Sequence, residues 1–275
     1  MKKLLIPVLL GLAFQSTAVF AANVSSAQAS FDWNAMTFSL LDLNPSDGLS
    51  PSVTWSGQHG STSANANSSD GGHSSYINDS YNAPSATSVV SSNAVTFYAI
   101  GTSTYDKQSL TVTANADTSS VPTGSSGYAS TGASATQYST FSLSGAGVMV
   151  INVPYTITVT GDLYNYWDYS SANLSISSNY SASDSSSSGS ARANKSFYSY
   201  STGDKSYSGV FTVAVANASD LITTSGSLNS SLSVYANADS YTYVPGVPEP
   251  ETYAMMLAGL FLIGSVARRQ TLKSV

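Results

Sequence analysis

Alternation of apolar and polar residues is the clearest pattern in the middle of the chain. From Met149 to Val159 every second residue is apolar, and most positions between them hold threonine, asparagine or proline. A second run begins at Tyr207 and places Phe211, Val213 and Val215 on the same side. This period of two predicts half-buried strands. Pro154 interrupts the first run, and because proline donates no backbone hydrogen bond, that strand is expected at a sheet edge or with a bulge.

Weaker alternation predicts further strands at 95–100, 110–116, 174–176 and 228–236. Turn-forming sequences separate these runs: "NPSDG" at 44–48, "VPTGSSG" at 121–127 and "TGDKS" at 202–206. Serine, threonine, asparagine, valine and tyrosine dominate, and they favour strands and turns over helices. The sequence therefore predicts an all-β fold, with an antiparallel β-sandwich-like body over residues 22–246.

Two low-complexity segments are expected to be mobile loops outside the sheets, because they contain few apolar residues: 57–82 and 181–190. A faint internal similarity is also present. "TFSL" occurs at 37–40 and again at 140–143, and "SLTVTANADTSSVP" at 109–122 resembles "SLSVYANADSYTYVP" at 231–245. Either an old duplication of a β-unit or chance in a sequence of few residue types accounts for it.

Composition and charge exclude several classes of protein. The chain has no cysteine, so a buried core and not disulfides must stabilise it. Between residues 23 and 245 thirteen aspartates face four basic residues, Lys107, Arg192, Lys195 and Lys205. Binding to nucleic acid needs clustered lysine and arginine, so nucleic acid is not an expected partner.

The N-terminus has the features of a secretory signal peptide. Lys2 and Lys3 precede the apolar run "LLIPVLLGLAF", and small residues follow. We place signal peptidase cleavage after Ala21, with cleavage after Ala22 as the neighbouring alternative. Residues 1–21 are thus expected to form a signal helix that directs the chain through the general secretion machinery.

The C-terminus reads "VPEPETYAMMLAGLFLIGSVARRQ" from 247 to 270. Residues 253–267 are mostly apolar and would span about 22 Å as a helix, a short transmembrane helix for a hydrocarbon layer of about 30 Å. Arg268 and Arg269 form a basic stop that stays on the cytoplasmic side, as do residues 271–275. Pro248 and Pro250 keep the preceding chain extended and accessible to a protease.

This tail resembles the PEP-CTERM sorting signal. Its core is Val247, Pro248, Glu249 and Pro250, followed by Thr252 and Tyr253, an apolar helix with Gly259 and Gly264, and the closing arginine pair. Glu251 departs from the frequent serine, and Tyr253 from the frequent tryptophan. The resemblance implies recognition by an exosortase, a membrane protease or transpeptidase that cleaves near the triplet, in Gram-negative bacteria that make exopolysaccharide and biofilms. An ordinary membrane anchor with an incidental triplet is the alternative.

Some classifications label the same tail an ice-binding protein C-terminal domain. An ice-binding face needs ranks of Thr-x-Thr at strand spacing. The sequence shows such runs only at 111–113 and 156–160, which we expect to lie on isolated strands. The label is therefore not taken to indicate ice binding.

The sequence predicts no active site and no cofactor. His59 and His73 are the only histidines, and both fall in the predicted loop at 57–82. A Ser-His-Asp site needs a positioned histidine, and no Gly-x-Ser-x-Gly motif occurs. Two loop histidines without a thiol do not make a zinc site. Paired aspartates for glycoside cleavage stay open, so a secreted hydrolase is the least favoured alternative.

A binding role is the stronger rival. "GDLYNYWDYS" at 161–170 is rich in aromatics, and a strand there would place Tyr164, Tyr166 and Asp168 on one face and Trp167 with Tyr169 on the other. Tyr164, Tyr166 and Trp167 are candidate glycan contacts, with Asn165 or Asp168 bonding sugar hydroxyls, although such rings often simply pack. We thus expect an exported, non-enzymatic surface or matrix protein associated with exopolysaccharide, with a carbohydrate-binding adhesin as the alternative.

Overall fold

The structure is a computed structural model, which describes residues 24–70, 72–83, 89–106, 108–121, 126–161, 168–184, 188–199 and 204–240. Within these ranges the regular structure is entirely β, as predicted, and forms two antiparallel sheets. The strands are β1 (Val24–Asp32), β2 (Thr37–Asp42), β3 (Ser52–Ser69), β4 (Ser74–Ala83), β5 (Val90–Val95), β6 (Ala99–Asp106), β7 (Ser109–Asp117), β8 (Gly127–Ser144), β9 (Gly147–Thr160), β10 (Tyr169–Ala182), β11 (Ser188–Tyr198), β12 (Lys205–Asn217) and β13 (Thr223–Ser240).

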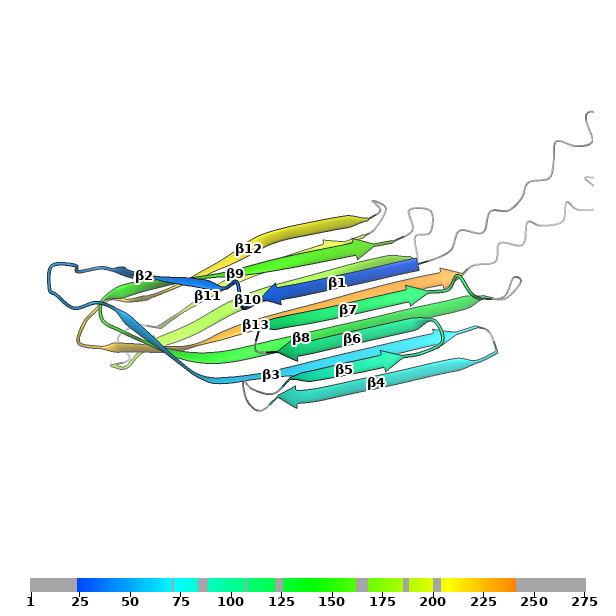
Figure 1. The fold of residues 1–275 in the computed structure, drawn as a ribbon, viewed down its shortest axis with the longest axis horizontal. Helices are drawn as coiled ribbons and strands as arrows, with labels where there is room; N and C mark the ends of the chain where they lie inside the picture. Colours follow the sequence, from blue (N-terminus) through cyan, green and yellow to red (C-terminus); the bar gives the residue numbers. More distant parts are fainter. Residues whose placement is uncertain are drawn as a thin grey trace, which may run out of the picture. The chain divides into compact units, whose positions relative to one another are not determined.

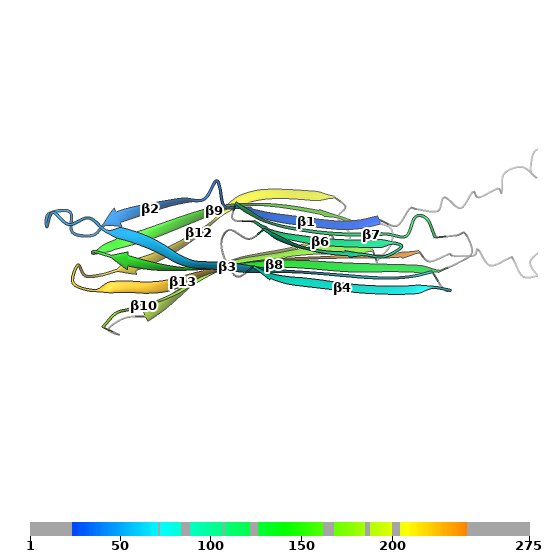
Figure 2. The same cartoon turned by 60° about the horizontal axis from the view of Figure 1, so that its bottom comes forward.

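The first sheet has the order β12-β9-β1-β7-β6-β5, with β2 paired to β9 beyond the end of β1. The second has the order β11-β10-β13-β8-β3-β4. Figure 2 shows the two layers, with β1, β6 and β7 lying over β8, β13 and β4. The edge strands also meet in pairs: β4 lies against β5 on one side, and β11 lies against β12 on the other.

The strongest alternation marks the core of the first sheet. In β9 the side chains of Met149, Ile151 and Val153 are fully buried, and the prediction for this strand is confirmed. In β12 the predicted inner residues Phe211, Val213 and Val215 are buried, whereas Tyr207 at the start of the strand is 36% exposed. Each fully buried aliphatic side chain contributes about 1.5–3 kcal/mol to folding. The runs at 110–116, 174–176 and 228–236 are strands as well.

Pro154 does not mark an edge strand, because β9 lies inside its sheet between β12 and β1. Instead it lies at an interruption. The pairing of β1 with β9 ends at Tyr155, and the pairing of β2 with β9 begins at Asn152. No strand pairs with β9 at Pro154 on that side, and such a local gap tolerates a residue without an N–H group.

Two sequence predictions are wrong, and a third is wrong in part. The segment 57–82 is not a mobile loop, because it forms most of the β3–β4 hairpin. Residues 95–100 do not form one strand, since they span the turn between β5 and β6. The segment 181–190 is only partly a loop, because residues 181–182 end β10 and 188–190 begin β11.

The internal similarity at 109–117 and 231–239 has a structural counterpart. These segments form β7 and the second half of β13, and the two strands face each other across the core and run in the same direction (Figure 1). Both carry inward residues in the order Leu, Val, Ala, Ala: Leu110, Val112, Ala114 and Ala116 in β7, and Leu232, Val234, Ala236 and Ala238 in β13. The core therefore narrows toward the alanine ends of these strands.

Hydroxyl and amide side chains cover the outer faces. Ser61 pairs with Thr136 at 2.7 Å and Ser63 with Ser134 at 2.8 Å on the second sheet. The predicted isolation of the Thr-x-Thr runs is wrong in one respect. Their threonines lie on the same face of the first sheet, on β7 and β9, the two strands that flank β1. On β1 itself, Gln28 and Ser30 lie between them. The face is thus mixed in chemistry and is not a regular array of threonine.

The predicted signal peptide and the whole predicted sorting tail lie outside the described residues. The described residues contain no helix with the length and apolar character needed to cross a membrane.

Candidate functional site

A cleft of about 600 Å³ lies where the regular strands are interrupted. Trp33 and Trp55 contribute aromatic walls, and the polar side chains around them are Asn34, Gln58, Gln108 and Gln137. The described lining residues include no acidic or basic side chain. Its volume is within the 300–1,000 Å³ that is typical of small-molecule sites.

Trp33 is placed by the break between β1 and β2. Its backbone N–H donates to the carbonyl oxygen of Gln108 at 2.9 Å, which anchors the break to the turn between β6 and β7. The N–H of Ala35 donates to Asp32 Oδ1 at 3.1 Å and closes the turn. The indole packs against Phe31, with ring centroids 6.1 Å apart. The interruption beside Pro154 therefore directs a tryptophan into the cleft.

Trp55 is placed by an irregularity in β3. The register of β3 against β8 shifts between Ser56 and His59, and Gly57 has a φ of 61°, in the left-handed region that favours glycine. A Cβ at Gly57 would lie 2.8 Å from Thr140 Oγ1, so the close approach also favours glycine. Trp55 packs edge-on against Phe141 at 5.7 Å. Bulges of this kind commonly redirect side chains beside functional sites.

Gln137 is the unusual residue of the cleft wall. It occupies an inward position of β8, where Ala135 and Ser139 are its neighbours on the same face, and it is 4% exposed. Its Oε1 atom is buried and accepts no hydrogen bond within the described part of the chain, and the same holds for the Nε1 donor of Trp33. A buried polar atom left unpaired destabilises a fold by about 1–3 kcal/mol.

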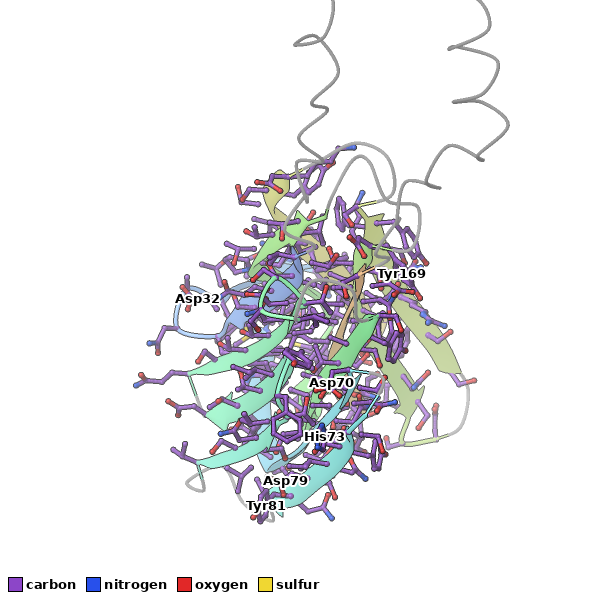
Figure 3. The ribbon with its side chains drawn as sticks, turned by 90° about the vertical axis from the view of Figure 1, so that its right-hand side faces the viewer. Asp32, Asp70, His73, Asp79, Tyr81 and Tyr169 are labelled. Carbon is purple, nitrogen blue, oxygen red and sulfur yellow. The ribbon has the colours of Figure 1, made fainter. Side chains whose placement is uncertain are left out.

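A second aromatic group lies on the outer face of the second sheet. Tyr169 on β10 and Tyr235 on β13 have ring centroids 5.5 Å apart, and Tyr128 is also near. Burial raises the pKa of Tyr235 well above its usual range, and the neighbouring tyrosines raise it further. Figure 3 shows Tyr169 well apart from Asp79 and Tyr81, which belong to the β4 edge.

The residues predicted as sites from the sequence fall largely outside the described ranges. These are the cleavage residues Ala21 and Ala22, the candidate glycan contacts Tyr164, Tyr166 and Trp167, the motif Val247, Pro248, Glu249 and Pro250, and the basic stop Arg268 and Arg269. Asp168 is described, but it is 2% exposed and its Oδ1 accepts the backbone N–H of Asp239 at 2.7 Å. The expectation that Asp168 bonds sugar hydroxyls is therefore wrong, because the carboxylate is buried in the fold.

The two histidines lie in different settings. His59 is part of β3, where its ring packs on Tyr138 with centroids 4.7 Å apart. His73 lies in the turn between β3 and β4, with Nδ1 3.4 Å from Asp70 Oδ1 (Figure 3). Within the described ranges no three His, Asp or Glu side chains gather closely enough to hold a metal ion.

Comparison with known proteins adds no family. No protein-family model matches the chain, and no curated protein matches it. Among solved structures, the crystal structure of the 7S globulin from Momordica charantia aligns over 75% of this chain and 83% of its own, with 8% identity. Its TM-score of 0.08 is too low to support a shared fold.

The sequence prediction missed the cleft completely. One signal was present, because the chain has only three tryptophans and two of them stand next to amide or small polar residues in "DWN" and "WSGQ". Small-molecule pockets are lined mainly by apolar and aromatic side chains with a few polar groups, which is the combination that these two short sequences hold. Nothing in the sequence, however, indicated that residues 33, 55 and 137 come together.

Proposed function

We propose that this protein is an exported, non-enzymatic component of the cell surface or extracellular matrix of a Gram-negative bacterium, associated with exopolysaccharide. The observation that carries the proposal is the pairing of a signal-peptide sequence at one end with the "VPEP" tail and its arginine pair at the other. In this proposal the tail holds the chain transiently in the inner membrane until an exosortase-type protease removes it.

The character of the body is compatible with such a role. Outer faces of hydroxyl and amide side chains, as in the Ser26–Thr160 pair at 2.7 Å and the Ser175–Ser231 pair at 2.9 Å, offer many groups for contact with hydrated polysaccharide. The fold also needs no disulfide, because a continuous core joins the two sheets.

Mass spectrometry of the protein recovered outside the cell tests this proposal. The mature chain is expected to begin at Ala22 or Asn23 and to lack Arg268 and Arg269. In a strain without the exosortase, the arginines are expected to remain. Recovery of an extracellular chain that still ends after Arg269 in the wild-type strain would exclude processing at the triplet.

The second candidate function is a carbohydrate-binding adhesin that uses the aromatic stretch at 164–169. The observation in its favour is that Tyr169, at the end of that stretch, lies beside Tyr235 on an outer sheet face. Changing Tyr166 and Trp167 to alanine with the fold intact is expected to abolish retention on glycan if this candidate holds, and to leave retention unchanged if the body acts as a scaffold.

A further inference from the structure

We propose that the cleft between Trp33 and Trp55 is a binding site for a neutral saccharide. This site lies away from the 164–169 stretch and adds a ligand to the proposed function without depending on the sorting signal. Three features of the cleft support this: the chemistry of its wall, two buried atoms without partners, and the backbone irregularities that form it.

The wall chemistry favours sugar over other ligands. Indole faces stack on the apolar C–H faces of sugar rings, while amide groups donate and accept hydrogen bonds to hydroxyls. Asn34, Gln58 and Gln108 supply such amides. A phosphate or carboxylate ligand would need a basic partner, and a cation would need an acidic one. The described lining residues supply neither.

The unpaired atoms indicate that a ligand completes the site. Gln137 Oε1 needs a donor and Trp33 Nε1 needs an acceptor, and hydroxyl groups supply both. Trp33 and Gln137 both line the cleft. The terminal amide torsion of Gln137 is soft, so its rotation brings Oε1 to a bound ligand. A leucine at 137 would fill similar space without the destabilisation. A ligand hydroxyl that pairs with Oε1 accounts for a glutamine at this inward position.

The backbone irregularities also point to a formed site. The break between β1 and β2 and the bulge at Gly57 bring two tryptophans, 22 positions apart in the sequence, to the same opening. Each interruption removes ladder hydrogen bonds, which a regular strand would have kept. Both interruptions lie at the same cleft, and a binding site there accounts for both of them.

Tryptophan fluorescence of the full-length exported protein tests the proposal. In a Trp167→Phe background the emission reports only Trp33 and Trp55. The probes are neutral tetrasaccharides that differ in hexose and linkage, including cellotetraose, maltotetraose and laminaritetraose, with tetragalacturonate as the anionic comparison. We expect a saturable change with at least one neutral probe and none with the anionic one. Absence of any change up to about 10 mM, where a site with Kd near 1 mM is filled, would refute the proposal.

Variants separate binding from folding. Gln137→Leu is expected to weaken saccharide binding by about tenfold or more while leaving the melting temperature unchanged or higher, because it removes a buried unpaired acceptor. Gln58→Ala on the bulge is expected to weaken binding as well. Gln28→Leu, on the exposed outer face of β1, is the matched control and should bind normally. Normal binding by Gln137→Leu and Gln58→Ala would exclude this cleft as the site. If the cleft does not bind saccharide, the mass-spectrometric test of export and processing is unaffected. If that test fails, the proposal for the cleft is likewise unaffected.

Discussion

At Gly101 the backbone of one sheet touches the backbone of the other. A Cβ built there would lie 2.6 Å from Thr131 Oγ1, 2.9 Å from the carbonyl oxygen of Asn65 and 3.0 Å from that of Gly132. The hydroxyl of Thr131 also donates to the carbonyl of Asn65 at 2.8 Å, so neither group moves freely. Glycine is therefore required at position 101 because there is no space for a Cβ, and not because of its backbone conformation.

We expect Gly101→Ala to destabilise the protein by about 1–3 kcal/mol, because overpacking forces the two sheets apart. Chemical denaturation followed by circular dichroism measures the change. Gly72→Ala is the matched control: its Cβ would lie 3.8 Å from the nearest atom, Asp70 Oδ1, and a change within about 0.5 kcal/mol is expected. Equal stability of the two variants would contradict the close contact between the sheets.

Asp70 provides a residue-level test of the turn between β3 and β4. Its Oδ1 accepts the backbone N–H groups of His73 at 2.8 Å and of Gly72 at 3.1 Å. These backbone hydrogen bonds, that of His73 first, lower the pKa of the carboxyl below its usual range. The charged form is thus favoured in the folded state.

Since the folded pKa is depressed, the stabilisation is present above the unfolded pKa of aspartate and is lost as the pH falls through the lowered folded value. We expect the unfolding free energies of wild type and Asp70→Asn to differ near neutral pH and to converge in acid. An NMR titration of the side-chain carboxyl should show the lowered pKa. A carboxyl that titrates at or above the ordinary aspartate value would contradict the assigned hydrogen bonds.

At the scale of elements, prediction from sequence succeeded where the inward residues are large. β9 and β12 were found because isoleucine, valine and phenylalanine alternate with polar residues. β3 was missed because its inward residues are Gly60, Thr62, Ala64, Ala66 and Ser68, which do not form an apolar pattern. They are buried because the sheets come close together, a tertiary property that no local periodicity reports.

The cleft shows the same limitation. Its position depends on where β1 stops pairing with β9 and on a shift in the register of β3, and both are relations between distant segments. No pattern marked Gln137 as an inward residue, because serine and threonine fill inward and outward positions of β8 alike. The fold class follows from composition and turns, whereas the site follows from interruptions of the fold.

At the scale of the whole sandwich, the two pairs of edge strands differ in chemistry. Every basic residue that the structure describes lies on the β11–β12 side: Arg192 and Lys195 on β11, and Lys205 on β12. Large apolar groups are exposed on both sides, such as Tyr76 (68%) on β4 and Val210 (57%) on β12, so the basic side chains are what distinguishes the two. Basic side chains deter pairing between edges of separate molecules, and apolar edges favour it. The β4 edge is therefore the less protected side.

Ile77 offers a controlled test of that asymmetry. It is 39% exposed on β4, whereas Ile100 is 43% exposed on β6, which lies inside the first sheet. A lysine placed on an exposed edge strand opposes the addition of another strand, but one on an interior strand has no free edge to protect. We expect Ile77→Lys to reduce self-association at high protein concentration, as measured by sedimentation velocity, and Ile100→Lys to leave it at the wild-type level. Because both variants gain the same charge, an equal reduction in the two would assign the effect to net repulsion and would rule out the β4 edge as the route of association.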